Sequence, residues 1–206
     1  MRPPPRRRAR PNAVSSSPRA LPIDTATGLL TGVAQVLSPH CDARPPGVRP
    51  ELIVIHGISL PPGEFGGPWI DRLFTGNIPA DAPAALLDVA QLRVSAHVLV
   101  RRDGCLRQYV GFARRAWHAG RSQYRGREAC NDFSIGIELE GTDHTPYTDA
   151  QYESLAALVS GLLAAYPSLS PQHITGHSDI APGRKTDPGP AFDWARWHAT
   201  LAGRLA

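Results

Sequence analysis

The part of the chain richest in ionisable side chains is GHSDIAPGRKTDPGP, which runs from residue 176 to residue 190. Its three prolines and three glycines interrupt any helix or strand, so these side chains are expected in a loop. A catalytic zinc site takes three protein ligands, histidine and carboxylate among them, and leaves the fourth position to water. His177, Asp179 and Asp187 are therefore candidate zinc ligands.

A second histidine in a suitable position is His56. It follows four consecutive apolar residues, Leu52 to Ile55, which predict a strand buried on both faces. His56 would then stand at the end of that strand, where the chain leaves the core. The spacing of His56 and His177 matches no His-Glu-x-x-His helix, and the chain holds eight histidines. From the residues alone, each of the two fits an ordinary hydrogen-bonded histidine as well as a metal ligand.

The segment DFSIGIELEG places two carboxylates on a predicted strand. Its residues alternate in polarity, so one face carries the apolar side chains and the other carries Ser134, Gly136, Glu138 and Glu140. Glu138 thus points away from the apolar layer. By itself, this pattern fits a solvated strand carboxylate better than a catalytic one.

Eight segments of the chain, in order between about residues 28 and 198, resemble one known family. They are VIHGISLPPGEFGGPWIDRLFTGNI, LRVSAHVLVRRDG, RAWHAG, CNDFSIGIELEGTD, YTDAQY, TGH, RKTDPGP and FDWAR. The family is the cytoplasmic 1,6-anhydro-N-acetylmuramyl-L-alanine amidases of bacterial cell-wall recycling, the AmpD type. These are zinc amidases that share a fold with the peptidoglycan recognition proteins. Eight segments in register make the resemblance specific.

The resemblance implies that His56, His177 and Asp187 hold one zinc ion. Chemistry agrees, because two imidazoles and one carboxylate leave an open position for water and lower its pKa toward about 7. Asp179 is the rival of Asp187. We favour Asp187 because the family segment RKTDPGP falls there, and because Pro188 biases the residue before it toward an extended conformation.

The resemblance also assigns the groups that move protons and stabilise charge in amide hydrolysis. Glu138, the first glutamate of GIELEG, matches the proton-transfer residue, and Glu140 on the same face is its natural control. Lys185 matches the cationic residue that would stabilise the tetrahedral oxyanion. His97 and His118 are expected to support the site from behind or to lie in the core.

The substrate implied is a small anhydromuropeptide, cut between the lactyl group of anhydro-N-acetylmuramic acid and L-alanine. Arg93 matches the family arginine that pairs with the carboxylates of the peptide. Trp117 offers a flat apolar surface for the sugar, and fits a core aromatic residue equally well.

The chain departs from the family at three places. Gly57 stands where the family usually has asparagine, and Ala129 stands where a second arginine is expected. Ala85 and Leu86 replace aromatic side chains. None of these residues is among the proposed chemical groups, so the departures bear on substrate preference rather than on reaction type.

The strands that must position these groups can be read from periodicity. The run Leu52 to Ile55 predicts a buried strand, LLTGVAQVL an edge strand, and Asp103-Gly104 between two alternating runs a hairpin. Strands interleaved with helices predict an α/β fold, a single domain over residues 23–206 with a central mixed β-sheet flanked by helices.

Three helices are expected around that sheet. Thr148 and Gln151 form a capping box before a long helix with apolar residues at helical spacing. Asp193 caps a last helix, which buries tryptophan side chains. The segment PWIDRLF predicts a short helix within the otherwise irregular stretch from Pro61 to Pro83.

Residues 1–22 form a Pro/Arg-rich tail that we expect to be disordered. The net charge is +4, and because the first twenty residues hold six arginines and no acid, the remainder carries −2. A nucleic-acid partner is therefore not indicated. No apolar run approaches the roughly 20 residues of a membrane helix. No apolar signal segment follows the basic start, so we expect a cytoplasmic protein. We also expect a monomer without membrane insertion.

Two other functions compete with the cytoplasmic amidase. One is an exported amidase that acts on intact peptidoglycan, which the missing signal segment disfavours. The other is a module of the same fold that binds peptidoglycan without cutting it. Such a module should lack a metal ligand, whereas His56, His177 and Asp187 are all present.

Overall fold

The computed structural model describes residues 20–206 of the chain. Of the disordered tail expected over residues 1–22, residues 1–19 lie outside the described part. Leu21 packs against the main core, so the folded part begins slightly before the expected boundary at residue 23. None of the described helices is both long and apolar enough to cross a membrane.

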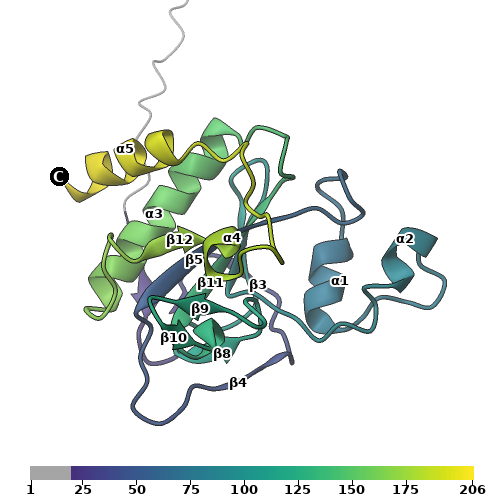
Figure 1. Ribbon diagram of the computed structural model, residues 1–206, viewed down its shortest axis with the longest axis horizontal. Coiled ribbons are helices and arrows are strands. Elements are labelled where there is room, and N and C mark those ends of the chain that lie inside the picture. Colours follow the sequence, from purple (N-terminus) through teal and green to yellow (C-terminus); the bar gives the residue numbers. More distant parts are fainter. Residues whose placement is uncertain (1–19) are drawn as a thin grey trace, which may run out of the picture.

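A six-stranded mixed sheet lies at the centre of the molecule (Figure 1). In spatial order its strands are β12 (Ile174–Gly176), β5 (Leu52–Ile58), β11 (Ser134–Glu140), β6 (Val98–Val100), β7 (Leu106–Gln108) and β3 (Ala34–Gln35). The first four run parallel, β7 is antiparallel to β6, and β3 is parallel to β7. The prediction of an α/β fold with a central mixed sheet is confirmed.

The expected strands form, with one difference in detail. The run Leu52 to Ile55 is completely buried in β5, as predicted for a strand covered on both faces. The hairpin at Asp103-Gly104 joins β6 to β7, and Gly104 adopts the left-handed conformation that favours glycine. The segment LLTGVAQVL does not form one edge strand. It is divided into β2 (Leu29–Leu30), which pairs with β1 (Ile23–Asp24), and β3, which is the edge of the central sheet.

Two long helices cover one side of the sheet. The helix α3 (Asp149–Ala165) begins at the predicted capping box of Thr148 and Gln151. The helix α5 (Trp194–Leu205) begins at Asp193, whose side chain accepts a hydrogen bond from the N–H of Arg196. Figure 1 shows α3 and α5 side by side, and both contribute to the main core. Both predicted helices therefore form, and each begins at its predicted cap.

Shorter elements complete the fold. The helix α1 (Trp69–Thr75) forms where PWIDRLF predicted it, and α2 (Ala84–Leu87) follows without having been predicted. Both lie at the right of Figure 1, away from α3 and α5. Two small antiparallel pairs were also not predicted: β4 (Cys41–Ala43) with β8 (Arg114–Ala116), and β9 (Gln123–Tyr124) with β10 (Arg127–Glu128). A 3-10 helix, η1 (Cys130–Asp132), precedes β11, and α4 (His177–Ile180) follows β12.

Candidate active site

The ends of neighbouring parallel strands bring the predicted chemical groups together. His56 on β5 lies directly opposite Glu138 on β11 in the register of the sheet. On the other side of β5, β12 ends at Gly176, so His177 follows at the first position of α4. Ligand sites commonly form outside the carboxyl ends of parallel strands, because the chain leaves the sheet there.

The three residues predicted to bind metal converge on one point. His56 Nδ1 lies 3.0 Å from His177 Nδ1, and each of these two nitrogens lies 3.1 Å from Asp187 Oδ2. A tetrahedral ion with bonds of about 2.0 to 2.2 Å would place its ligand atoms roughly 3.3 to 3.6 Å apart. The group is therefore nearly the right size to bind a metal ion such as zinc.

The hydrogen bonds behind the histidines fix which nitrogen faces inward. His177 Nε2 lies 3.1 Å from the carbonyl oxygen of Ala119, which can only accept, so Nε2 carries the hydrogen and Nδ1 offers a lone pair. Ser134 Oγ donates to the carbonyl of Cys130 at 2.5 Å, and therefore accepts from His118 Nε2 at 3.1 Å.

The hydrogen bonds of His118 also determine which nitrogen of His56 carries the hydrogen. Because His118 Nε2 carries the hydrogen, His118 Nδ1 accepts from His56 Nε2 at 2.9 Å, and His56 Nδ1 is left as a lone pair. His118 lies against Gly136, where any Cβ would come within 2.4 Å of the imidazole ring. The three inward atoms are thus all acceptors, an arrangement that a cation between them would stabilise.

Burial favours the neutral form of the imidazoles of His56 and His118. Desolvation lowers the pKa of His56 to about 4, although the nearby Asp187 carboxylate acts in the opposite direction. Desolvation, with the neighbouring His56 next, lowers the pKa of His118 well below its ordinary value. Neutral imidazole is the form that ligates metals. The electrostatics of the pocket therefore agree with the hydrogen-bond pattern.

Asp179, the alternative candidate ligand, lies outside the group of His56, His177 and Asp187. Asp179 Oδ2 accepts hydrogen bonds from Thr175 Oγ1 at 2.7 Å and from the N–H of Gly176 at 2.9 Å. These contacts tie the carboxylate to the start of α4, away from the group formed by His56, His177 and Asp187. Of the two aspartates, the structure thus brings Asp187 to the histidines.

Glu138 is buried, with 9% of its surface exposed, and its Oε2 has no hydrogen-bond partner among the described residues. Every residue of β11 is buried, so the alternative of a solvated strand carboxylate is wrong. Desolvation, followed by repulsion from Asp187, raises the pKa of Glu138 well above its ordinary value. A buried carboxylate without a partner is costly, and such groups are typical of functional sites.

Glu140, two residues further along β11, is fully engaged. Its Oε1 accepts from the N–H of Gly66 at 2.5 Å, and its Oε2 accepts from the N–H of Arg102 at 3.2 Å. Glu140 therefore anchors the loop before α1, and it does not line the cavity that contains Glu138.

A cavity of about 210 Å³ connects these groups. Its wall includes His56, Gly57, Ile58, Leu73, Phe74, Leu92, Val94, Ser95, Trp117, His118, Glu138, His177, Lys185 and Asp187. Of the remaining predicted residues, Lys185 and Trp117 thus line the cavity. Arg93 is exposed and does not line it, although its neighbours Leu92 and Val94 do.

His97 belongs to the buried frame behind the site. Its Nδ1 accepts from the N–H of Gly136 at 3.0 Å, and its Nε2 lies 3.1 Å from the carbonyl of Arg114. Desolvation, with the positive charge of the half-buried Arg44 next, lowers the pKa of His97 to about 3. His97 thus holds a neutral, structural position, in line with the role expected for it.

Sequence reasoning missed several residues that support the site. Ser134 and Tyr147 carry no motif that would have revealed them, because Ser134 contacts His118, 16 residues before it, and Tyr147 contacts Pro188, 41 residues after it. Tyr147 donates to the carbonyl of Pro188 at 3.0 Å, next to Asp187. A Cβ at Gly57 would lie 2.4 Å from Tyr147 Oη. The departure at Gly57 therefore affects packing behind Asp187 as well as the wall of the cavity.

An α/β fold whose mixed sheet places two histidines and an aspartate beside a buried glutamate is typical of a metal-dependent hydrolase. The family model described as N-acetylmuramoyl-L-alanine amidase matches residues 46–190. The chain belongs to the N-acetylmuramoyl-L-alanine amidase family.

Individual relatives agree. The chain is 63% identical over 174 residues to the 1,6-anhydro-N-acetylmuramyl-L-alanine amidase AmpD of Enterobacter cloacae, an alignment that covers 84% of this chain and 92% of the relative. It is similar to the crystal structure of a selenomethionine derivative of AmpD, with a TM-score of 0.83 and 59% identity. The similarity covers 87% of this chain and 98% of the AmpD chain.

A more distant structure contains a substrate. The Escherichia coli amidase AmiD, solved in complex with anhydro-N-acetylmuramic acid-L-Ala-D-γ-Glu-L-Lys, has a TM-score of 0.54 and 30% identity. The similarity covers 76% of this chain and 60% of AmiD.

Proposed function

We propose that the chain is a zinc-dependent amidase in which His56 Nδ1, His177 Nδ1 and Asp187 Oδ2 hold the ion. It cleaves the amide bond between N-acetylmuramic acid and L-alanine in muropeptides, a reaction of peptidoglycan recycling. The observation that carries the proposal is the convergence of three acceptor atoms within 3.1 Å of one another beside the unpartnered Glu138 carboxylate. A non-catalytic module would not need that carboxylate.

When bound, zinc supplies a water of lowered pKa and an electrophile for the amide carbonyl. The chain's own residues would do the rest. Glu138 Oε2 faces no protein donor, so it is free to take the proton of the attacking water and then deliver it to the amine of L-alanine. Burial raises the pKa of Glu138, which favours its acting as both base and acid near neutral pH.

Lys185 supplies positive charge at the same cavity. Its exposed side chain borders the space between the metal-binding group and solvent, where the amide oxygen would become negative. An ammonium beside an oxyanion lowers the barrier by charge stabilisation. Lys185 is thus proposed to stabilise the tetrahedral intermediate.

We propose anhydromuropeptides as substrates, because the AmpD relative is named for that activity and AmiD is seen with such a molecule. Trp117 would contact the sugar. Arg93, which is exposed just outside the cavity, would meet carboxylates of the peptide. The expected compartment is the cytoplasm, where recycled fragments would be processed.

The proposal can be tested by metal analysis and by cleavage of a purified anhydromuropeptide. We expect about one zinc per chain and release of the free peptide. Asp187→Ala should lose both the zinc and the activity. Asp179→Ala is the matched control and should keep both, because within residues 20–206 the Asp179 carboxylate accepts hydrogen bonds from Thr175 and Gly176 and not from the two histidines. A fully active Asp187→Ala enzyme would exclude the ligand assignment, and cleavage of intact sacculi alone would replace the proposed substrate.

A further inference from the structure

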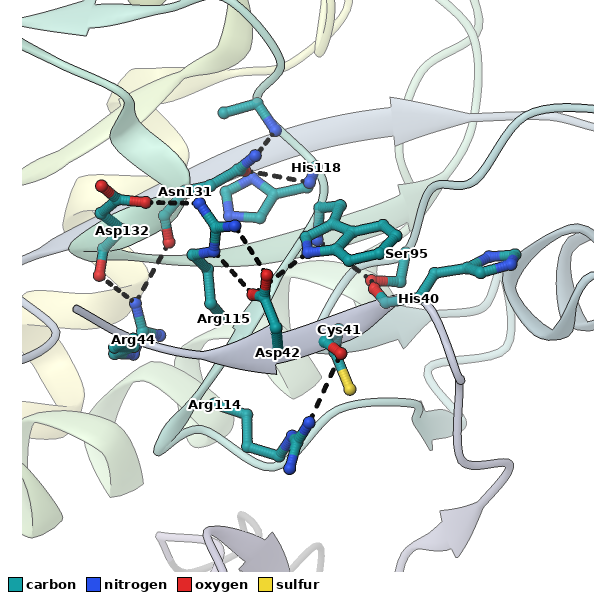
Figure 2. Close-up of polar contacts among 12 residues, drawn as sticks. His40, Cys41, Asp42, Arg44, Ser95, Arg114, Arg115, His118, Asn131 and Asp132 are labelled. Carbon is teal, nitrogen blue, oxygen red and sulfur yellow. Dashed lines mark hydrogen bonds and ion pairs between the residues drawn. The ribbon is translucent and has the colours of Figure 1, made fainter.

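A network of charged side chains lies directly behind the indole of Trp117. Trp117 Nε1 donates a hydrogen bond to Asp42 Oδ1 at 3.2 Å. Arg115 donates two hydrogen bonds to the same carboxylate, from Nε to Oδ1 at 2.6 Å and from Nη2 to Oδ2 at 2.7 Å. Its third nitrogen, Nη1, reaches Asp132 at 2.7 Å. Figure 2 shows Arg115 extended between Asp42 and Asp132.

The pairing of two short strands creates this network. In the antiparallel pair of β4 and β8, Asp42 lies directly opposite Arg115. Side chains two residues apart project from the same face of extended chain, so Trp117 follows Arg115 on the side where Asp42 stands. Asp42 is therefore the one member of the network that contacts both the arginine and the indole.

The backbone and the ring of Trp117 are held from another direction as well. The N–H of Trp117 donates to Ser95 Oγ at 3.1 Å, and Ser95 Oγ donates to the carbonyl of His40 at 2.7 Å. The ring of His40 lies nearly parallel to the indole, with centroids 6.1 Å apart and an interplanar angle of 13°. Ser95 and Trp117 both line the cavity that contains the metal-binding group.

We propose that Asp42 is a positioning residue, which fixes the Trp117 indole as the wall of the cavity against which the sugar ring of the substrate packs. The apolar C–H face of a sugar pairs well with a flat aromatic ring, provided that the ring is already in place. An indole without a partner for its N–H would sample other orientations, and binding would then have to order it. This inference rests on the proposed function, because it assigns the sugar side of the same site.

Steady-state kinetics with an anhydromuropeptide test the role of Asp42. Asp42→Ala should raise KM about threefold to tenfold, which corresponds to ordering one side chain on binding, while kcat stays within about twofold. Asp42→Asn retains an oxygen that accepts the indole N–H, so it should restore most of the wild-type KM. A purely structural ion pair with Arg115 predicts the opposite, because asparagine would be as damaging as alanine. The matched control is Glu51→Ala, which removes a comparable ion pair with Arg127 outside this cavity.

A double-mutant cycle tests the route of the effect. Trp117→Phe removes the N–H, so adding Asp42→Ala to Trp117→Phe should raise KM no further. A full additional increase in the double variant would overturn the proposal, and so would a wild-type KM in Asp42→Ala.

A binding measurement separates this inference from the proposed reaction. In ¹⁵N-labelled protein, anhydro-N-acetylmuramic acid should shift the Trp117 indole signal, which the Trp117→Phe spectrum identifies, and the shift should shrink in Asp42→Ala. This signal does not depend on turnover or on the zinc assignment. An unmoved indole signal in a protein that cleaves the muropeptide would overturn the role of Trp117 and Asp42 while leaving the amidase intact.

Discussion

Glu138 is the residue whose environment is least compatible with a purely structural role. A carboxylate that is almost entirely buried, with one oxygen lacking any partner in the described part of the chain, destabilises the folded state when it ionises. Proteins retain such groups where the chemistry requires them. The cost of Glu138 should therefore be measurable as stability that returns when its charge is removed.

Glu138→Gln tests this cost through its pH dependence. The pKa of Glu138 is raised in the folded state, so ionisation favours unfolding, and the penalty grows as the pH rises above the ordinary carboxyl pKa of 4.5. In metal-free protein at pH 7, Glu138→Gln should be about 1 to 3 kcal/mol more stable than wild type. Below pH 4.5 the two should converge, because both states of the wild type then hold the proton.

Denaturant unfolding at pH 4 and pH 7 provides the measurement. The variant should also lose amide cleavage while keeping its metal. Glu140→Gln is the control, because Glu140 accepts hydrogen bonds from two backbone N–H groups, and its loss should lower stability instead. Equal stability of Glu138→Gln and wild type at both pH values would contradict the account.

At the scale of elements, the site depends on how the ends of β5, β11 and β12 meet the loop that carries Asp187. Parallel pairing fixes His56 opposite Glu138 and sets Gly176 one strand away. The loop that carries Asp187 is held in place by the hydrogen bond that Tyr147 Oη donates to the carbonyl of Pro188. Gly57, just after His56, leaves the space that the Tyr147 hydroxyl occupies.

Gly57→Ala should disturb this fastening. The new Cβ would lie 2.4 Å from Tyr147 Oη, and Tyr147 is only 4% exposed, so the ring has little room to retreat. We expect a loss of about 1 to 3 kcal/mol in stability, together with weaker zinc binding as the support behind Asp187 shifts. Thermal unfolding and competition with a chelator measure the two effects.

Two further variants decide whether the clash is the cause. Tyr147→Phe removes the hydroxyl, so Gly57→Ala should cost less stability in the Tyr147→Phe background than in wild type. Gly203→Ala, at a helical position with no neighbour within 4 Å, should be neutral or slightly stabilising. A Gly57→Ala protein that matches wild type in both measurements would exclude the proposed packing role.

At the scale of the whole molecule, the proposed metal-binding group of His56, His177 and Asp187 joins segments that are distant in the sequence. His56 comes from β5, His177 from the start of α4, and Asp187 from the loop that follows. The close contacts among His56 Nδ1, His177 Nδ1 and Asp187 Oδ2 span sequence separations of 121, 131 and 10 residues. An ion at this point would act as a cross-link that exists only in the folded state.

Removal of the metal should therefore destabilise the whole domain. A ligand that binds only the folded state contributes about 4 kcal/mol when its free concentration is 1,000 times its dissociation constant. We expect treatment with a chelator to lower the unfolding midpoint by several degrees, and added zinc to restore it. Asp187→Ala should not respond to zinc, and an unchanged midpoint in wild type would argue against zinc binding by this group.

Local patterns predicted the larger elements well. The buried run in β5, the capping box of α3 and the Asp-Gly turn of the β6–β7 hairpin are each specified by a few neighbouring residues. The pair of β4 and β8 escaped prediction because its strands are three residues long and largely polar, with no alternation to detect. Such strands form because their partner is present, a condition that local sequence does not contain.

The sequence by itself determined the kinds of group available, their order along the chain and the family to which they belong. Tertiary structure decided what each group does. Partners from other parts of the chain, Ala119 for His177 and His118 for His56, turn Nδ1 of both histidines inward. Burial is likewise a property of the assembled sheet, which is why a glutamate that looked solvated on its strand became the isolated carboxylate of the cavity.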